Sequence, residues 1–193
     1  MADNKNSKGL LNEKQKTVSD LKKHVRTIPH FPKQGIMFRD ITTLLQHPGA
    51  FKKTCDALYH RYKDKKIDVV VGIESRGFVF GAVLAYMLGV GFVPVRKPGK
   101  LPHKVIHEEY ELEYGKDAVE MHADAITKGQ KVLIVDDLIA TGGTVCAAIK
   151  LVERLGGKVV ECCFVVELPE LKGKEKLDRL GYKMFSLVSF EGE

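Results

Sequence analysis

Two aspartates followed by a small, hydroxyl-bearing turn are the residues of this chain whose types and spacing point most clearly to chemistry. The apolar run 132–135 leads directly into Asp136 and Asp137, and the turn ATGGT follows at 140–144. Glycines expose successive backbone N–H groups, and a helix N-terminus adds a positive end, so the turn predicts a site for one phosphate. Carboxylates aimed at that phosphate would repel it, whereas sugar hydroxyls or a divalent cation would suit them. The run therefore predicts a ribose 5-phosphate site.

The residues around the turn exclude two other phosphate motifs. No Gly-Lys-Ser/Thr follows it, as a P-loop would require, and the Gly-x-Gly-x-x-Gly fingerprint of dinucleotide sites is missing there. The alternative interpretation is a strand, turn and helix with an acidic cap and no ligand. Four apolar residues, two acids and a small, hydroxyl-bearing turn in that order favour the ribose phosphate site.

The elements expected to position this run alternate between strands and helices. Apolar strands are predicted over 67–73, 91–95, 131–135, 159–166 and 183–190, and helices over 48–62, 78–88, 142–155 and 171–180. Continuous Val/Ile runs are typical of strands buried on both faces, so the pattern predicts a doubly wound α/β core with a parallel sheet. Ligands of such sheets bind beyond the carboxyl ends of the strands, where the Asp pair is expected.

The remaining segments are expected to be less regular. The sequence predicts a helix over 12–26, an irregular loop over 28–35, a long mobile loop over 97–110, and an extended hairpin arm through Leu112, Tyr114, Val119 and Met121. We expect a flexible basic tail over residues 1–11 and one domain over 12–193, with a small N-terminal hood over about 12–45 and a core over about 46–193.

Composition limits the class of protein. With 44% hydrophobic and 29% charged residues, the 193-residue chain is typical of a globular protein and not of a disordered one. The N-terminus has no apolar core of a signal peptide, and no apolar run approaches the ~18 residues of a membrane span. The four cysteines form no C-x-x-C pair or zinc spacing. We therefore expect a reduced, cytoplasmic enzyme with no membrane partner.

Most of the net charge of +6 lies near the N-terminus. Residues 1–33 contain eight Lys/Arg and three Asp/Glu, a net of +5, which leaves +1 for the other 160 residues. A basic tail can attract nucleic acid or anionic membranes. The alternative is a solvated terminus, which we favour because no Phe, Tyr or Trp in residues 1–30 offers a stacking platform. No nucleic-acid partner is expected.

The run 132–144 resembles the phosphoribosyl-pyrophosphate motif of the type I phosphoribosyltransferases. The resemblance implies the type I phosphoribosyltransferase fold, a doubly wound, mostly parallel sheet with a mobile catalytic loop and a small N-terminal hood. In that family the two acids hold the ribose 2′- and 3′-hydroxyls and the turn holds the 5′-phosphate. Those roles would fall on Asp136 and Asp137, and on Ala140, Thr141, Gly142, Gly143 and Thr144.

Three further segments resemble the adenine-specific members of this family: 31–41 (FPKQGIMFRDI), 74–78 (ESRGF), and 96–102 with 110–115. The resemblance implies purine salvage, in which adenine and 5-phosphoribosyl 1-pyrophosphate (PRPP) give AMP and pyrophosphate. It also implies Mg²⁺ held mainly by PRPP and water without dedicated protein ligands, and a homodimer. Two alternatives stay open, namely an enzyme for hypoxanthine, guanine or orotate, and a regulatory module that senses purine or PRPP.

The resemblance also assigns roles around the base. Adenine would lie between Phe38 and Leu138, with backbone groups near Met37 and Arg39 reading the ring edge. Core packing is the alternative role for Phe38.

The loop and its neighbourhood receive the remaining roles. Glu113 would handle the proton near adenine N7/N9, or would only order the loop, and Tyr114 would act as a lid residue. The family's pyrophosphate contacts would fall on Glu74, Ser75, Arg76, Arg96, Lys97 and Lys100, with Arg76 and Lys100 also catalytic beside Glu113.

Overall fold

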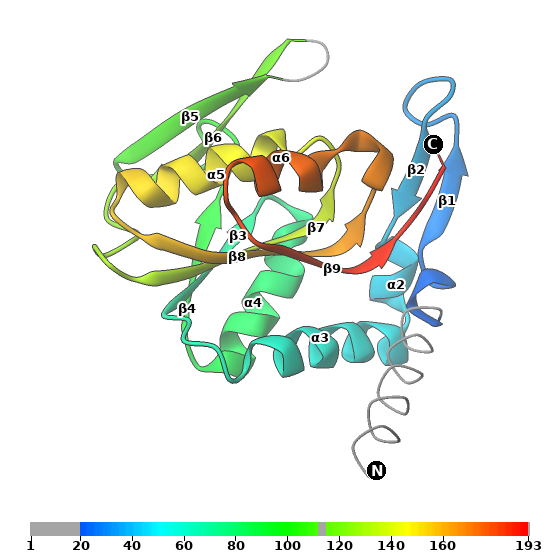
Figure 1. Ribbon diagram of the computed structural model, residues 1–193, viewed down its shortest axis with the longest axis horizontal. Helices are drawn as coiled ribbons and strands as arrows, with labels where there is room; N and C mark the ends of the chain where they lie inside the picture. Colours follow the sequence, from blue (N-terminus) through cyan, green and yellow to red (C-terminus); the bar gives the residue numbers. More distant parts are fainter. Residues whose placement is uncertain (1–19, 112–114, 193) are drawn as a thin grey trace. The chain divides into compact units, whose positions relative to one another are not determined.

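The computed structural model describes residues 20–111 and 115–192 of the chain (Figure 1). These fall into two units, each described by itself: an N-terminal unit of residues 20–54 with Gly192, and a sheet unit of residues 55–191. Glu113 and Tyr114, for which loop roles are expected, lie outside the described residues.

A five-stranded sheet organises the sheet unit, and every neighbouring pair of strands in it is parallel. Its order is β4 (Gly91–Val95), β3 (Val69–Ile73), β7 (Lys131–Ile139), β8 (Lys158–Glu167) and β9 (Met184–Ser189). All five residues of β3 are buried, and residues 132–135 of β7 are 0% exposed. This burial on both faces explains the continuous Val/Ile runs and confirms the predicted parallel core.

The chain leaves the two central strands in opposite directions. β3 leads through α4 (Arg76–Leu88) to β4 at one edge, whereas β7 leads through α5 (Gly143–Arg154) to β8 on the other side. Figure 1 shows α4 on one face of the sheet and α5 with α6 (Gly173–Arg179) on the other. The point where such connections diverge leaves a crevice at the carboxyl ends of the strands, here between β3 and β7.

An antiparallel hairpin, β5 (Val105–Glu111) with β6 (Lys116–His122), extends from the sheet unit and is called the hairpin arm below. Arg96 and Glu120 form an antiparallel bridge that joins the arm to the segment after β4. Glu108 holds the arm on α5 through ion pairs with Lys150, at 2.8 Å, and Arg154, at 3.4 Å. The arm is therefore anchored at the sheet and at the helix that begins in the crevice.

The N-terminal unit contains a second antiparallel hairpin, β1 (Arg26–Pro29) with β2 (Met37–Asp40), followed by α2 (Thr42–Gln46). α3 (Pro48–Tyr62) leads from this unit into the sheet unit. Hydrogen bonds from Thr42 and Arg26 lower the pKa of the buried Asp40 carboxyl to about 2, against the opposing effect of burial. Asp40 therefore fixes the end of β2 in its charged form.

Several predicted elements are confirmed. The helix predicted over 48–62 has those bounds in α3, and the strand over 91–95 has them in β4. The helices predicted over 78–88 and 142–155 and the strands over 67–73, 159–166 and 183–190 agree with α4, α5, β3, β8 and β9 to within two residues at each end.

Three expectations were wrong in part. Residues 105–110 belong to strand β5 and not to a loop. The strand was missed because Glu108, an inward position that pairs with Lys150 on α5, is charged and interrupts the apolar alternation. The strand ending in the Asp pair continues to Ile139, because Asp136 and Leu138 still pair with β8. Residues 26–29 form β1, because pairing with β2 outweighs the local proline signal at its last residue.

Two smaller differences concern helices. The helix expected over 171–180 is a 3₁₀ turn over Pro169–Leu171 followed by α6 from Gly173. The helix expected over 12–26 has ended by Lys23 in the described part, and residues 12–19 lie outside it. Within the described ranges, no helix is both long enough and apolar enough to span a membrane.

Candidate active site

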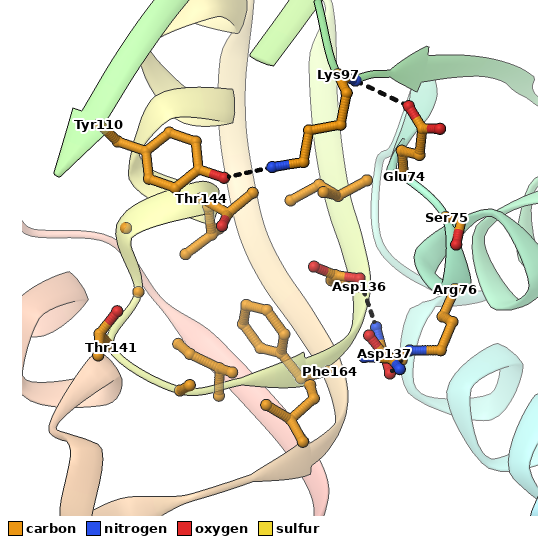
Figure 2. Close-up of a pocket in the computed structure, with 17 residues that line it drawn as sticks. Glu74, Ser75, Arg76, Lys97, Tyr110, Asp136, Asp137, Thr141, Thr144 and Phe164 are labelled. Atoms are coloured by element: carbon orange, nitrogen blue, oxygen red, sulfur yellow. Dashed lines mark hydrogen bonds and ion pairs between the residues drawn. The ribbon is translucent and has the colours of Figure 1, made fainter. Parts of the chain in front are cut away.

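A cavity of about 360 Å³ opens at the crevice between β3 and β7 (Figure 2). It is lined by the ends of these strands, by the starts of α4 and α5, and by the side chains of Lys97, Tyr110 and Phe164. The volume suits a small-molecule ligand. Because α4 and α5 both begin here, two helix N-termini lie at one cavity, an arrangement that favours two anionic groups.

The turn before α5 forms one end of the cavity. Gly142 adopts φ +76° at the N-cap, a conformation that a side chain would strain, and the helix begins at Gly143. A side chain at Gly143 would approach the Tyr110 ring to 3.1 Å, so the hairpin arm packs directly on the turn. Glycine is therefore favoured at 142 by the backbone conformation and at 143 by the neighbouring Tyr110 ring.

Support for this turn comes from the start of α6. A Cβ at Gly173 would lie 2.3 Å from the carbonyl oxygen of Ala140 and 2.7 Å from the Ile139 side chain. The N–H of Leu168 donates to the Ile139 carbonyl at 3.1 Å. The segment after β8 therefore packs in van der Waals contact against residues 139 and 140, at the start of the turn.

The two acids face different surroundings (Figure 2). Asp137 is 4% exposed, and its Oδ2 lies 2.6 Å from Nε of Arg76. Asp136 lines the cavity and accepts the N–H of Asp137 at 2.8 Å. Burial raises the pKa of the Asp136 carboxyl above its ordinary value, and the neighbouring Asp137 adds to the rise. Hydroxyl donors or a cation beside Asp136 would favour its charged form.

The turn after β3 forms the other end of the cavity. It contains a cis peptide bond between Glu74 and Ser75. A Cβ at Gly77 would lie 2.7 Å from the Val135 carbonyl oxygen, so only glycine lets the start of α4 approach β7 this closely. These contacts place Ser75 and Arg76 at the edge of the cavity.

Glu74 links this turn to the segment after β4. Its carboxylate accepts hydrogen bonds from the Arg96 guanidinium at 3.1 and 3.3 Å and from the Lys97 N–H at 2.8 Å. Burial alone would raise the pKa of Glu74, but these donors outweigh burial and hold it below the ordinary value. Glu74 thus stays charged and fixes the backbone at Lys97.

Most of the residues predicted for PRPP lie together in this cavity. Those lining it are Glu74, Ser75, Arg76, Lys97, Asp136, Asp137, Ala140, Thr141, Gly142, Gly143 and Thr144, and Leu138, which is predicted to contact adenine, lines it as well. The guanidinium of Arg96 pairs instead with Glu74 and donates to the Lys100 carbonyl at 3.1 Å, and neither Arg96 nor Lys100 is part of the lining.

The predicted adenine contacts divide between the two units. Met37, Phe38 and Arg39 lie on β2 in the N-terminal unit, where the Phe38 ring meets Phe31 edge to face at 5.2 Å between centroids. Leu138 lies on β7 in the sheet unit. The adenine slot between Phe38 and Leu138 stays a prediction, as do the roles of Glu113 and Tyr114.

Sequence reasoning gave no role to three aromatic or charged side chains at this site. Tyr110 and Phe164 line the cavity, and Asp117 forms an ion pair with Lys97. Phe164 lies inside an apolar strand and gave no signal of its own. Asp117 lies two residues before Val119 in β6, where the period of two could have placed it inward, whereas the charge of Glu108 hides the alternation that includes Tyr110 in β5.

Comparison with known proteins places this architecture in a family. Residues 40–191 match the model of the phosphoribosyl transferase domain. An adenine phosphoribosyltransferase from Desulfosudis oleivorans is 62% identical over 90% of this chain and 99% of its own length. The crystal structure of adenine phosphoribosyltransferase from Thermoanaerobacter pseudethanolicus superimposes with a TM-score of 0.86 at 53% identity, covering 90% of this chain and 99% of that one.

A second solved structure was determined with ligands. The Saccharomyces cerevisiae adenine phosphoribosyltransferase, in complex with an imino-altritol bisphosphate and adenine, is 46% identical, has a TM-score of 0.83, and is covered over 99% of its length by 90% of this chain. The relatives and the structures agree in name, and each is matched over nearly its whole length. The chain belongs to the adenine phosphoribosyltransferases, within the phosphoribosyl transferase domain family.

Proposed function

We propose that the cavity between β3 and β7 binds PRPP and joins adenine N9 to its C1′, giving AMP and pyrophosphate. The observation that carries this proposal is the convergence of two helix N-termini on one cavity with an Asp pair between them. PRPP carries anionic groups at both ends of a diol-bearing sugar, which is the charge pattern such a cavity complements.

The ribose 5-phosphate half is assigned to β7 and the turn that follows. Backbone N–H groups of residues 140–144 and the hydroxyls of Thr141 and Thr144 would bind the 5′-phosphate at the start of α5. Asp136 would accept hydrogen bonds from the ribose hydroxyls, which would favour its charged form. Asp137 holds Arg76 and would contribute to the same hydroxyl contacts.

The pyrophosphate half is assigned to the turn after β3. Ser75 and the N-terminus of α4 would bind the leaving group, with Arg76 and Lys97 supplying positive charge. As the bond at C1′ breaks, negative charge grows on pyrophosphate, so donors already in place stabilise the transition state. Lys100 and Arg96 would join when the loop after β4 closes.

Adenine recognition is assigned to the N-terminal unit acting as a hood. Phe38 would stack on the base opposite Leu138, and backbone groups near Met37 and Arg39 would read the ring edge. Within its unit, Arg39 is held by Thr27 and by the Gly192 carbonyl, which would keep β2 rigid beside the base. Glu113 would take up the N9 proton and Tyr114 would exclude water.

Mg²⁺ would be held by the phosphates and ribose hydroxyls of PRPP and by water, and Asp136 is one carboxylate of the cavity that could contact its water ligands. When bound, the ion neutralises charge on the leaving pyrophosphate.

Steady-state assay with separate bases tests the function. The purified chain with PRPP and Mg²⁺ is expected to form AMP from adenine, and to use hypoxanthine, guanine and orotate at least about a hundredfold less well. A chelator is expected to abolish turnover. Binding of PRPP without any product would favour the regulatory alternative, and preference for another base would contradict the adenine assignment.

Asp137→Asn is expected to raise the KM for PRPP about tenfold and to leave the KM for adenine within about twofold. The substitution removes the charge that holds Arg76 at 2.6 Å. The matched control is Asp124→Asn, which makes the same charge change at an exposed position of the sheet unit. Initial rates over a PRPP series measure the effect, and unchanged kinetics in Asp137→Asn would rule out its role.

Assembly and location complete the proposal. α4 exposes Val79 and Tyr86, at 37% and 86%, and we assign this face to a homodimer contact. A solution mass of about 21.5 kDa, that of one chain, would contradict the dimer.

All four cysteines are free, which is typical of a reducing compartment and supports a cytoplasmic location. Cell fractionation tests this location.

A further inference from the structure

The side chain of Lys97 reaches from the sheet to the hairpin arm. Its N–H donates to Glu74, which fixes its backbone. Its Nζ donates to Tyr110 Oη at 3.0 Å and forms an ion pair with Asp117. Tyr110 in turn donates its hydroxyl to Asp117 Oδ2 at 3.0 Å. Figure 2 shows Lys97 and Tyr110 pointing toward one another beside the cavity.

This arrangement orients the Lys97 ammonium and leaves it able to donate a hydrogen bond to an anion in the cavity. An ammonium has three N–H donors, and the two arm residues take two of them. Among the described residues no third acceptor is bonded to this nitrogen, and Lys97 lines the cavity, so the third donor can serve an anion there. Burial alone would lower the pKa of Lys97, but the hydrogen bonds with Asp117 and Tyr110 outweigh burial and raise it. The group is therefore a fixed positive charge at neutral pH.

The ring and the hydroxyl of Tyr110 contact different parts of the site. Its ring packs against Gly143, at the start of α5, where a Cβ would meet the ring at 3.1 Å. Its hydroxyl reaches Lys97 instead. The ring therefore touches the 5′-phosphate half of the site, and the hydroxyl serves the residue assigned to the pyrophosphate half.

We propose that Tyr110 and Asp117 are positioning residues, which hold the Lys97 ammonium in place for the pyrophosphate group of PRPP. The proposal rests on the proposed function, because it takes pyrophosphate as the ligand of this half of the cavity. Lysine is a long, flexible side chain, and fixing it on binding costs affinity. When the protein fixes it beforehand, that cost no longer falls on the ligand.

Binding of each product alone separates the two halves of the site. Isothermal titration of the full chain with magnesium pyrophosphate and, separately, with AMP is the measurement. Asp117→Asn and Tyr110→Phe are each expected to weaken pyrophosphate binding about three- to tenfold and to change AMP binding by less than about twofold. Tyr110→Phe keeps the ring on Gly143, so the 5′-phosphate turn retains its neighbour.

The matched control is Glu109→Gln. Glu109 lies beside Tyr110 on the same arm and pairs with Lys116 at 3.5 Å, and its substitution makes the same charge change as Asp117→Asn. It is expected to leave both affinities unchanged. Equal weakening of AMP and pyrophosphate in Asp117→Asn would indicate a general loss of arm structure and would overturn the proposal. Unchanged or tighter pyrophosphate binding would overturn it as well.

A double-mutant cycle shows whether Asp117 acts through Lys97. In a Lys97→Met background, Asp117→Asn is expected to have no further effect on pyrophosphate affinity. A further loss of the same size would contradict a positioning role. These titrations need no turnover, so failure of the parent chain to form AMP would count against the proposed function and not against this inference.

Discussion

Gly173→Ala is expected to raise the KM for PRPP and the dissociation constant of AMP by at least about tenfold, although Gly173 does not line the cavity. A Cβ there would lie 2.3 Å from the Ala140 carbonyl oxygen, which is backbone and cannot rotate away. The turn that is proposed to bind the 5′-phosphate must therefore shift. The free energy of unfolding is expected to fall by about 1–3 kcal/mol from the same overlap.

The control for this substitution is Lys174→Ala. Lys174 follows Gly173 on α6 and is exposed, so its removal leaves the turn untouched. Initial-rate kinetics and AMP titration, with denaturant unfolding of both variants, make the comparison. If a folded Gly173→Ala protein bound AMP with the affinity of the parent, the contact between Gly173 and Ala140 would not determine the conformation of the turn.

Glu161→Gln is expected to lower the free energy of unfolding by about 2 kcal/mol near neutral pH. The Glu161 side chain is 5% exposed and pairs with Arg61 at 2.8 Å and Lys65 at 2.9 Å. Loss of a buried partner usually costs more, but these two cations are about one third exposed and regain water. Urea unfolding measures the difference.

The effect of Glu161→Gln is expected to depend on pH. Burial alone would raise the pKa of Glu161, but hydrogen bonds from Arg61 and Lys65 hold it below the ordinary 4.5. A carboxyl with a lowered folded-state pKa stabilises above its unfolded value and loses that contribution as pH falls. The gap between parent and variant should therefore narrow below about pH 4.5 and stay constant above it.

Glu175→Gln is the control for this measurement. Glu175 pairs with Arg179 at 3.1 Å on the surface of α6, where both side chains are more than half exposed. Its loss is expected to cost less than about 0.5 kcal/mol at any pH. A pH-independent gap for Glu161→Gln would show that the carboxylate charge is not the source of its stabilisation.

Local sequence was sufficient for the sheet and for the phosphate turn. Residues 132–144 combine an apolar strand, two acids and glycines that permit positive φ, so strand, turn and helix could all be predicted from neighbours in sequence. The turn after β3 was located because ESRGF follows an apolar strand, and its pyrophosphate role was predicted from the family resemblance alone. Each of these features is determined within a few residues.

Features that depend on distant partners could not be predicted. β1 exists because it pairs with β2, and β5 because it pairs with β6, and in both cases proline or charge obscured the pattern. The role of Gly173 depends on Ala140, more than thirty residues earlier in the chain. The sequence around a glycine that starts a short helix does not indicate which distant backbone atom the glycine contacts.

The connections after β3 and β7 run in opposite directions along the sheet, and this has a consequence for the order of product release. In the proposed function, the two helix starts are separate structural supports, one for the 5′-phosphate and one for the pyrophosphate of PRPP. PRPP would then reach both ends of the cavity, whereas pyrophosphate and the phosphate of AMP would each occupy one. After the bond at C1′ breaks, the phosphate of AMP and the pyrophosphate would lie at different helix starts, which the Arg76–Asp137 ion pair and the Lys97–Tyr110 hydrogen bond connect. We therefore expect pyrophosphate to be able to dissociate while AMP remains at the start of α5.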